Sequence, residues 1–351
     1  MTWTFEDKTV LVIGRGEIGS AVYSVVSKHF KADSYDIADG EPSRLRFKHY
    51  DVLHICIPYQ VTPSLAKWAL DYANLFTPKL ILIESTVAPD TTREISKSLD
   101  KSILLCHSPV NGRLLEGVEW GLTHYTKFIG PMSDAAALVA TKYYEHMGLQ
   151  TRVCENPEQT EWMKILDTTY WGLLIGWWQE IERISHEFNL NLQDICKFFG
   201  TIQDKSKGKI PRPILYVGPM GGHCIISNAR LLLTKHDSNF VEDIIRSQLT
   251  FESSMQSTFG FGEKQGCPLC GRIYTRKIYR DESSEPFIII ECLSCRTPMV
   301  VFRSHRKPSN LVMMQSERVA KTLFPSLEIN LSKGVIPDHP HYHLRKKKEV
   351  E

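Results

Sequence analysis

The chain has 351 residues, of which 42% are apolar and 23% are charged, an ordinary globular composition that excludes a disordered or fibrous protein. Its length predicts about two or three domains and a core large enough to fold without disulfide bonds. Residues 262–351 carry 16 Lys and Arg against 10 Asp and Glu, a net of +6 that leaves −4 for residues 1–261, so a basic C-terminal module is expected on a mildly acidic body.

No targeting or membrane segment is predicted. No apolar stretch follows a basic N-terminal segment, as a secretory signal peptide requires. The candidate apolar run, Trp171–Trp178, has only eight residues before Gln179 and Glu180 close it, which is too short to cross a bilayer. The nine cysteines are an odd number in a long chain, which favours reduced thiols. We therefore expect a cytoplasmic protein without membrane contact.

A strand, a glycine turn and a helix are predicted in succession near the N-terminus. Thr9–Ile13 is a β-branched run that leads into GRGEIG at residues 14–19, and an apolar helical pattern continues to Val26. In this context the first glycine permits a tight turn, the second admits a pyrophosphate, and the third packs the helix on the strand. The sequence therefore predicts a dinucleotide site, the alternative being a glycine turn of another α/β fold.

Further strands are predicted at Val52–Ile57 and Leu80–Ile83, each apolar enough for a parallel sheet that is buried on both faces. Ligands of such a sheet bind at the carboxyl ends of its strands. Asp36 ends a predicted strand and is placed to accept hydrogen bonds from an adenosine ribose, which favours NAD over NADP. The predicted cofactor-binding residues are Gly14, Gly16, Glu17, Ile18, Gly19, Asp36, Pro58, Ser85 and Thr86.

Four motifs resemble a known enzyme family. They are GRGEIG, then HICIPY at 54–59, IESTVAPDTT at 83–92 and HSPVNGRLLEG at 107–117. Their order and spacing are similar to those of the dehydrogenases related to UDP-glucose and GDP-mannose dehydrogenase, within a group that includes 6-phosphogluconate and β-hydroxyacid dehydrogenases. Residues 108–112 are closer to the β-hydroxyacid branch. The resemblance extends to about residue 235, and it implies an NAD-dependent oxidoreductase that forms homodimers through a long central helix.

One long helix without proline is predicted from Gln159 to Phe188. The family places a catalytic lysine here, in an E-x-x-K setting that Glu161 and Lys164 reproduce, so the resemblance implies Lys164 as a base or as the stabiliser of an oxyanion. Without the resemblance, Lys164 is an ordinary solvated lysine. The family usually has an asparagine four residues later, where Thr168 offers a single hydroxyl.

The segment GPMGGHC at residues 218–224 looks like the G-P-x-x-G-G-H-C stretch of nucleotide-sugar dehydrogenases, whose cysteine attacks an enzyme-bound aldehyde. The resemblance implies Cys224 as a nucleophile, with a structural thiol as the alternative. Two carboxylates of the family are replaced, one by Val110 and one by Asn228. A two-electron interconversion of alcohol and carbonyl is therefore favoured over a complete four-electron oxidation.

Two CxxC pairs in the C-terminal part predict a zinc ribbon. They are separated by 21 residues in which Arg272–Tyr279 and Phe287–Glu291 are predicted strands. Four thiolates at this spacing close a tetrahedral zinc site, which supplies the stability that so small a segment lacks. A redox disulfide does not explain two pairs. The predicted ligands of this structural zinc are Cys267, Cys270, Cys292 and Cys295.

The family would carry a second Rossmann-like domain after residue 236, and no such unit is predicted here. Zinc ribbons often bind nucleic acid or protein, and phosphate-compatible charge is supplied by Arg296, Arg303, Arg306 and Lys307, although a solvated structural module explains them equally. The tail alternates His339, His341 and His343, which either lie on one side of a strand and bind a metal or belong to a disordered tail.

The predicted fold is thus α/β, with a Rossmann doubly wound sheet at residues 1–152, an all-helical substrate and dimerisation domain at 153–258, a zinc ribbon at 262–310 and a basic His-rich tail at 311–351. The predicted catalytic residues are Lys164, Cys224, Thr86 and Thr168. The predicted function is NAD-dependent oxidation of an alcohol of a sugar or nucleotide-sugar-like small molecule. The alternative is a catalytically degenerate NAD-binding protein whose zinc ribbon contacts nucleic acid or a protein partner.

Overall fold

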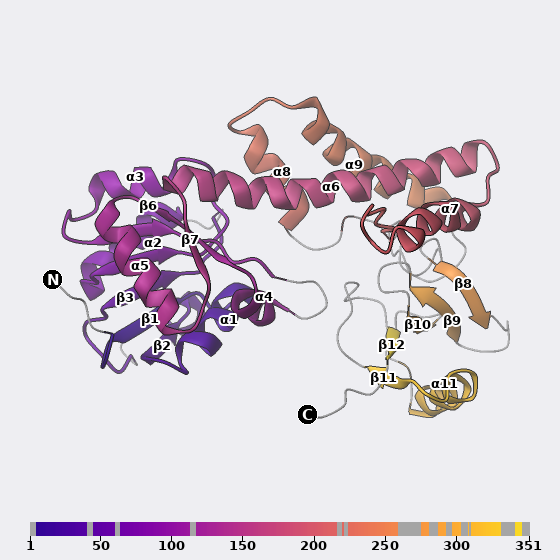
Figure 1. Cartoon of the computed structure of the whole chain (residues 1–351), viewed down its shortest axis with the longest axis horizontal. Helices are drawn as coiled ribbons and strands as arrows, with labels where there is room; N and C mark the ends of the chain where they lie inside the picture. Colours follow the sequence, from indigo (N-terminus) through magenta and orange to yellow (C-terminus); the bar gives the residue numbers. More distant parts are fainter. Residues whose placement is uncertain are drawn as a thin grey trace. The chain divides into compact units, whose positions relative to one another are not determined.

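The computed structural model describes most of the chain, namely residues 5–40, 45–59, 64–112, 117–215, 220, 224–258, 275–280, 287–292, 297–302, 308, 310–330 and 341–345. The chain consists of two compact units (Figure 1). The first comprises residues 1–168 and 230–237, and the second comprises residues 169–229 and 238–351. The division therefore falls after the predicted boundary at residue 152.

A seven-stranded sheet forms the centre of the first unit, in the order β2-β1-β3-β4-β5-β6-β7. The strands are β1 (Thr9–Ile13), β2 (Lys31–Tyr35), β3 (Val52–Ile55), β4 (Leu80–Ile83), β5 (Leu104–His107), β6 (Lys127–Pro131) and β7 (Thr151–Val153). Strands β1 to β5 are parallel, and β6 runs antiparallel to β5. The strand order reverses at β1, so a crevice for a ligand is expected at the carboxyl ends of β1 and β3.

Helices cover both faces of this sheet, because its strands are apolar on both sides. The helices of the first unit are α1 (Glu17–Val26), α2 (Leu65–Phe76), α3 (Thr91–Ser98), α4 (Val118–His124) and α5 (Asp134–His146), with a 3-10 turn at Ile37–Asp39. Val10 and Val12 of β1 share a core with α1 and α5, whereas Leu11 and Ile13 share a second core with α2 and α3. The predicted doubly wound Rossmann sheet is confirmed.

Four helices follow, and the predicted long helix is the first of them. They are α6 (Pro157–Glu187), α7 (Leu192–Lys205), α8 (Cys224–Leu233) and α9 (Asn239–Thr258). Both α6 and α8 contain residues of each unit, since the unit boundaries lie within them. In the part of the chain that the structure describes, no helix is both long and apolar enough to cross a bilayer.

A second, antiparallel sheet of five strands lies in the second unit, in the order β11-β12-β10-β9-β8. Its strands are β8 (Thr275–Arg280), β9 (Phe287–Cys292), β10 (Pro298–Phe302), β11 (Glu328–Asn330) and β12 (His341–Arg345), and α11 (Asn310–Leu323) precedes β11. The predicted strands at Arg272–Tyr279 and Phe287–Glu291 match β8 and β9 closely. The whole sheet is larger than the predicted ribbon.

This sheet is buried on both faces, and it joins the predicted ribbon to the predicted tail. One face of β9 and β10 packs on Trp178 of α6, Cys196 of α7 and Phe251 of α9. The other face, to which Tyr342 and Leu344 of β12 also belong, packs on α11. The tail segment 341–345 is therefore a strand between β10 and β11. The predicted division into ribbon and tail at residue 310 stays a prediction. Alternate apolar side chains, which the flanking histidines obscure in the sequence, account for this strand.

Candidate functional site

The three glycines of the turn after β1 have different surroundings, as the predicted dinucleotide motif leads us to expect. Gly14 has a φ of +94°, and a Cβ there would lie 2.6 Å from the carbonyl oxygen of Cys56. A Cβ on Gly19 would lie 1.8 Å from the Gly14 carbonyl oxygen, so only glycine lets α1 approach β1. A Cβ on Gly16 would meet no atom within 4 Å. The backbone is thus open at the N-terminus of α1, where a pyrophosphate fits.

Asp36 lies directly after β2 and beside this turn. Its carboxylate accepts the N–H of Arg15 at 2.7 Å and the N–H of Ala38 at 3.1 Å. The hydrogen bond from Arg15, followed by that from Ala38, lowers the pKa of Asp36, so the carboxylate is charged at neutral pH. Glu17 is exposed in the first turn of α1, whereas Ile18 packs against the core. The structure therefore brings Asp36 and the glycine turn together.

The predicted residues at the ends of β3 and β4 lie at the same edge of the sheet. Ser85 is buried, and its hydroxyl donates to the carbonyl oxygen of Ile57 at 2.6 Å, immediately before Pro58. Pro58 is exposed and Thr86 is half-buried. The Ser85 hydroxyl therefore joins two strand ends and leaves the neighbouring Thr86 as the more accessible of the two side chains.

Lys164 of α6 meets a residue that the sequence did not predict. Its Nζ donates to Oδ1 of Asn111 at 3.1 Å, and both residues are half-buried. Asn111 follows β5 within the HSPVNG motif. Its position after a predicted strand, at the carboxyl edge of the sheet, was the one feature of the sequence that could have identified it as a site residue. The Thr168 hydroxyl donates to the backbone carbonyl of Lys164 at 3.0 Å, one turn earlier in the same helix, rather than to Asn111.

Glu161, the acidic member of the E-x-x-K pattern, holds α6 against α3. Its carboxylate accepts the backbone N–H groups of Asp90 and Thr92, each at 2.8 Å, and the Thr92 hydroxyl at 2.6 Å. Glu161 is fully buried, and this burial raises its pKa to about 7 against the opposing effect of the hydrogen bonds. It therefore caps the N-terminus of α3 and positions the turn of α6 that carries Lys164.

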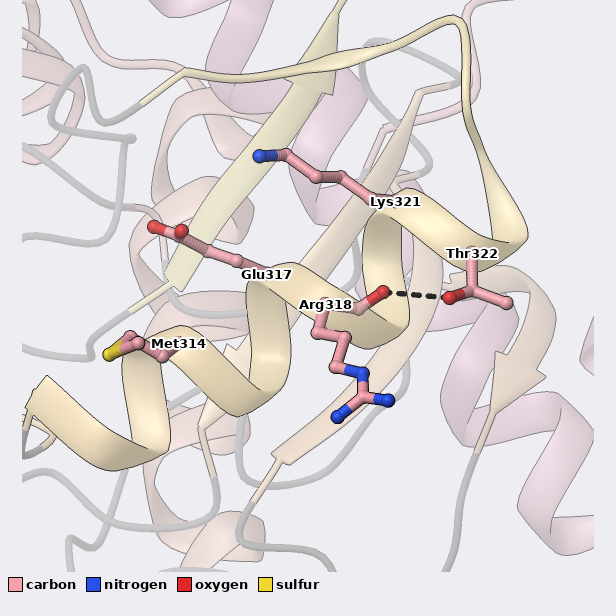
Figure 2. Close-up of a pocket in the computed structure, with 5 residues that line it drawn as sticks. All are labelled: Met314, Glu317, Arg318, Lys321 and Thr322. Atoms are coloured by element: carbon pink, nitrogen blue, oxygen red, sulfur yellow. Dashed lines mark hydrogen bonds between the residues drawn. The ribbon is translucent and has the colours of Figure 1, made fainter.

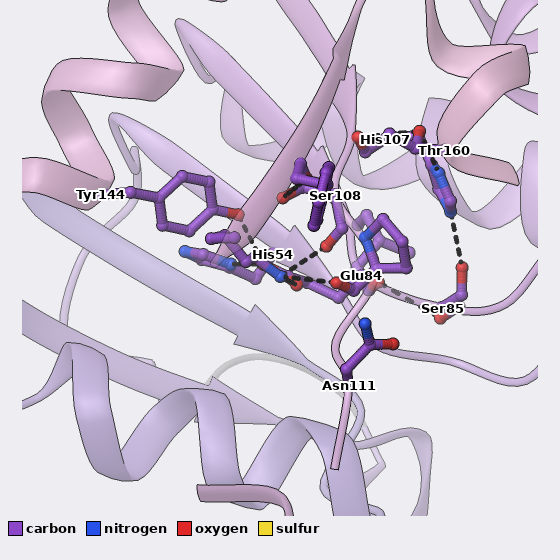
Figure 3. Close-up of polar contacts among 12 residues, drawn as sticks. His54, Glu84, Ser85, His107, Ser108, Asn111, Tyr144 and Thr160 are labelled. Atoms are coloured by element: carbon purple, nitrogen blue, oxygen red, sulfur yellow. Dashed lines mark hydrogen bonds and ion pairs between the residues drawn. The ribbon is translucent and has the colours of Figure 1, made fainter. Parts of the chain in front are cut away.

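A buried ionic network underlies this edge of the sheet (Figure 3). Glu84, at the end of β4, accepts the Lys127 ammonium at 2.5 Å and the Tyr144 hydroxyl at 2.9 Å, and its other contact is His54 Nδ1 at 2.8 Å. His54 Nε2 lies 2.8 Å from the hydroxyl of Tyr143. Burial alone would raise the pKa of Glu84, but the charge of Lys127 and the hydrogen bond from His54 lower it to about 2. Glu84 is therefore ionised at neutral pH in the folded protein.

Lys127 extends this network to the loop that carries Asn111. Its ammonium donates to the carbonyl oxygens of Ser108 at 2.6 Å and Pro109 at 3.2 Å. Val110 is buried in the core, so the next side chain that reaches the edge is that of Asn111. The buried cation thus fixes the backbone immediately before the partner of Lys164.

His107 connects β5 to both β4 and α6. Its Nε2 lies 3.1 Å from the Ser85 carbonyl oxygen, which can only accept, so Nε2 carries the proton. Nδ1 then accepts the hydroxyl of Thr160 at 2.7 Å. Burial lowers the pKa of His107 to about 4, so the ring is neutral at physiological pH. His107 is therefore a structural link between the strand ends and the start of α6.

The remaining predicted site residues lie in the second unit. Cys224 is exposed and begins α8, whereas most of the GPMGGHC segment lies outside the described residues. Cys292 is buried at the end of β9, and Cys267, Cys270 and Cys295 lie outside the described residues. Among the residues that the structure describes, no three metal-binding side chains come together. The zinc site thus stays a prediction.

A shallow depression on α11 is a separate surface feature (Figure 2). All of its lining comes from one helix: Met314, Glu317, Arg318, Lys321 and Thr322. The Thr322 hydroxyl donates to the carbonyl oxygen of Arg318 at 2.9 Å, as in an ordinary helix interior. None of the predicted site residues lies there, and its side chains of both signs are typical of a solvated helix face.

Comparisons with known proteins agree with the motifs. No model of a protein family matches the chain. It is 27% identical over 288 residues to the UDP-N-acetyl-D-mannosamine dehydrogenase of Methanocaldococcus jannaschii, covering 72% of this chain and 60% of the relative. It is also 27% identical over 240 residues to the enzyme of that name from Methanococcus vannielii, covering 63% and 48%. The chain thus spans about half the length of the curated relatives it matches.

Solved structures share the fold. The UDP-D-ManNAc dehydrogenase from Pyrococcus horikoshii has a TM-score of 0.58 and 18% identity, with 71% of this chain and 70% of that chain covered. A UDP-glucose dehydrogenase from Pyrobaculum islandicum has a TM-score of 0.55 and 14% identity, with 75% and 74% covered. The 3-hydroxyisobutyrate dehydrogenase from Mycobacterium tuberculosis has a TM-score of 0.53 and 13% identity, with 72% and 94% covered. These likenesses establish a dehydrogenase-like fold.

The buried network generates a stability prediction. Glu84→Gln leaves the Lys127 ammonium buried without a counter-charge, so we expect the free energy of unfolding to fall by about 3–5 kcal/mol in urea denaturation. Because the folded pKa of Glu84 is lowered from 4.5, the carboxylate stabilises above about pH 4.5, and this contribution is lost as pH falls toward about 2. The difference in the free energy of unfolding between wild type and Glu84→Gln should therefore become smaller only below about pH 4.5.

Two controls accompany this measurement. Glu119→Gln removes an exposed carboxylate that lies 2.8 Å from Lys28, and it should cost less than about 0.5 kcal/mol. The double variant Glu84→Met/Lys127→Met removes both buried charges, and it should recover part of the lost stability. If Glu84→Gln and Glu119→Gln lower the free energy of unfolding equally, the buried ion pair contributes no more to stability than an exposed one.

Proposed function

We propose that the chain is an NAD-dependent oxidoreductase that interconverts an alcohol and a carbonyl of a sugar or nucleotide-sugar-like small molecule. The glycine turn carries this proposal, because Gly14 and Gly19 let the turn and α1 pack closely, while Gly16 leaves the backbone open where a pyrophosphate would bind. The names of the relatives, UDP-N-acetyl-D-mannosamine dehydrogenases, support the substrate class. Asp36, charged and beside the turn, supports NAD over NADP.

The residues present fit an NAD cofactor, which when bound accepts a hydride from the substrate carbon. Gly16 and the N-terminus of α1 would hold the pyrophosphate, and Asp36 the adenosine ribose. Pro58 and Thr86, at the ends of β3 and β4, would line the cofactor further along the edge. The network of Glu84 and Lys127 lies beneath and keeps these strand ends in register.

Lys164 and Asn111 would hold the reacting oxygen of the substrate. The Nζ of Lys164 and the Oδ1 of Asn111 lie 3.1 Å apart at the carboxyl edge of the sheet, so a hydroxyl placed beside the pair could contact both side chains. As a neutral amine, Lys164 would take the hydroxyl proton while the hydride leaves to the cofactor; as an ammonium, it would stabilise the oxyanion in the reverse direction. Thr168 would support Lys164 through its helix, and Cys224 stays a candidate nucleophile for a further oxidation.

The replaced carboxylates favour the two-electron reaction. Val110 is buried in the core and Asn228 is buried in α8, so neither position supplies a base for hydrolysing a thioester. An alcohol and carbonyl interconversion needs no such base. The catalytically degenerate alternative, in which a zinc ribbon contacts nucleic acid or a protein partner, is separated from the enzyme by the turnover measurement below.

We also propose that Cys267, Cys270, Cys292 and Cys295 bind a structural zinc. Thr275, at the start of β8, is the register partner of Cys292, at the end of β9. Cys270 precedes Thr275 by five residues, within about 17 Å of extended chain, so both CxxC pairs can reach one end of this hairpin. The Cys292 N–H donates to the Thr297 carbonyl at 2.9 Å, which closes the second CxxC loop.

A homodimer is proposed from α6. Apolar side chains recur along it at alternate spacings of three and four residues, and each is 39–54% exposed: Met163, Leu166, Tyr170, Leu173 and Trp177. This is the spacing of a helix face that packs on another helix. A second copy of the chain that presents the same face would cover the stripe, as the resemblance to the dehydrogenases implies.

The catalytic prediction concerns Lys164. With NAD and UDP-N-acetyl-D-mannosamine or UDP-glucose, Lys164→Met should lower kcat by about 10²–10⁴-fold, because the proton acceptor is lost. The affinity for NADH, measured by calorimetry, should stay unchanged. Lys197→Met, on an exposed face of α7, is the matched control and should retain full activity. A wild type that binds no NADH would overturn the proposal, and one that binds NADH without turnover of any sugar nucleotide would favour the degenerate alternative.

The zinc prediction is a stoichiometry. Purified protein should contain one zinc per chain by elemental analysis, and Cys267→Ser or Cys295→Ser should lose it together with part of the thermal stability. Cys154→Ser, at a half-buried thiol of the first unit, should retain the metal. A stable, metal-free wild type contradicts the site.

The dimer prediction is a change in mass. Sedimentation velocity should give a dimer for the wild type and a monomer for Tyr170→Glu/Leu173→Glu, since a carboxylate in a helix interface is buried without a partner. Leu138→Glu on α5, where the leucine is 57% exposed, should remain dimeric. A monomeric wild type, or a dimeric double variant, would show that the exposed apolar face of α6 is not the dimer interface.

A further inference from the structure

The dinucleotide turn contains a cation that the proposed NAD site does not use. Arg15 lies between the first two glycines, and its backbone N–H donates to Asp36 at 2.7 Å. Its guanidinium is 46% exposed and forms a close ion pair with Asp39, which is 33% exposed. An arginine beside the adenosine ribose is the group that dinucleotide-binding folds use to accept a 2′-phosphate.

Asp39 is held in place by the backbone. Its Oδ2 accepts the N–H of Asp36 at 3.1 Å, while the Asp36 carboxylate accepts the N–H of Ala38, a reciprocal capping of the turn Ile37–Asp39. The Oδ1 atom is then directed to the Arg15 guanidinium. The ion pair therefore joins the glycine turn to the segment after β2. Because the backbone of Asp36 holds the Asp39 carboxylate in place, only the Arg15 side chain must be ordered to form the pair.

We propose that Asp39 is a specificity-determining residue, which restrains Arg15 and makes the turn reject a dinucleotide with a 2′-phosphate. This inference rests on the proposed function, and it deepens it by assigning the cofactor selectivity to a second residue besides Asp36. The three side chains carry a net charge of −1, so a phosphate of nearly two negative charges meets repulsion and a guanidinium that is already paired. The uncharged 2′-hydroxyl of NAD meets neither obstacle.

The test is the ratio of two dissociation constants. Asp39→Asn keeps an oxygen that caps the Asp36 N–H but removes the charge that holds Arg15. The Kd for NADPH, measured by calorimetry on the full chain, should fall at least tenfold, and the Kd for NADH should change less than threefold. The gain for NADPH should weaken as salt is raised, because it is a charge–phosphate contact.

Matched variants separate this from other causes. Arg15→Ala/Asp39→Asn should lose the gain, because the guanidinium that would bind the phosphate is absent. Asp7→Asn removes another exposed carboxylate, which pairs with Lys31 at 2.7 Å at the opposite end of β2, and it should leave the ratio unchanged. Asp39→Ser, which retains a capping hydroxyl, should behave as Asp39→Asn does and covers the case in which the asparagine variant is unstable.

The outcomes are distinct. A wild type that binds NADH, with an NADPH-to-NADH ratio that Asp39→Asn and Asp39→Ser both leave within twofold, overturns this inference and leaves the proposed function intact. A gain that persists without Arg15 also overturns it, because the guanidinium would then play no part. Failure of the wild type to bind NADH overturns the proposed function, and this inference falls with it.

Discussion

A carboxylate sealed inside a parallel sheet requires a counter-charge, and the site in the first unit depends on how this requirement is met. Glu84 is 1% exposed, and Lys127 reaches it from β6, across β5. The same ammonium binds the carbonyl oxygens of Ser108 and Pro109, which precede Asn111. Losing the pair would therefore disturb both the strand end that carries Thr86 and the loop that meets Lys164.

The glycine turn could be predicted from the sequence because its requirements are local. The strand, the three glycines and the helix are consecutive, and the closest contact of Gly19, with the Gly14 carbonyl oxygen, lies within the same motif. The approach of Gly14 to the carbonyl oxygen of Cys56 is the part that only the fold shows. Glu84, His54 and Lys127 could not be found in this way, since each is one polar residue in or beside an apolar strand and its partners are 30 and 43 positions away. Asn111 was missed for a related reason, because only the fold brings it to Lys164 from 53 positions away.

The C-terminal sheet shows a different limit of sequence patterns. The CxxC spacing suggests an autonomous ribbon, yet Ile288 and Ile290 of β9 share a core with Trp178 of α6 and Phe251 of α9. Strands that bury both faces against helices do not depend on a metal alone for their core. A zinc beside the start of β8 and the end of β9 would then stabilise that end of the hairpin. Its loss would also destabilise the packing of the helices on this sheet.

The preference for a two-electron reaction in the proposed function rests on where the polar groups lie along the edge of the first sheet. At the position after Ser-Pro, the resembling family has a glutamate, whereas Val110 here is 2% exposed and packs into the core. The next residue of the loop, Asn111, is the one whose side chain contacts Lys164. An amide accepts or donates a hydrogen bond but does not activate water by taking its proton. Under the proposed function, the edge would therefore keep a lysine and an amide to bind the alcohol, while Val110 would not supply the carboxylate that hydrolysis of an acyl intermediate uses.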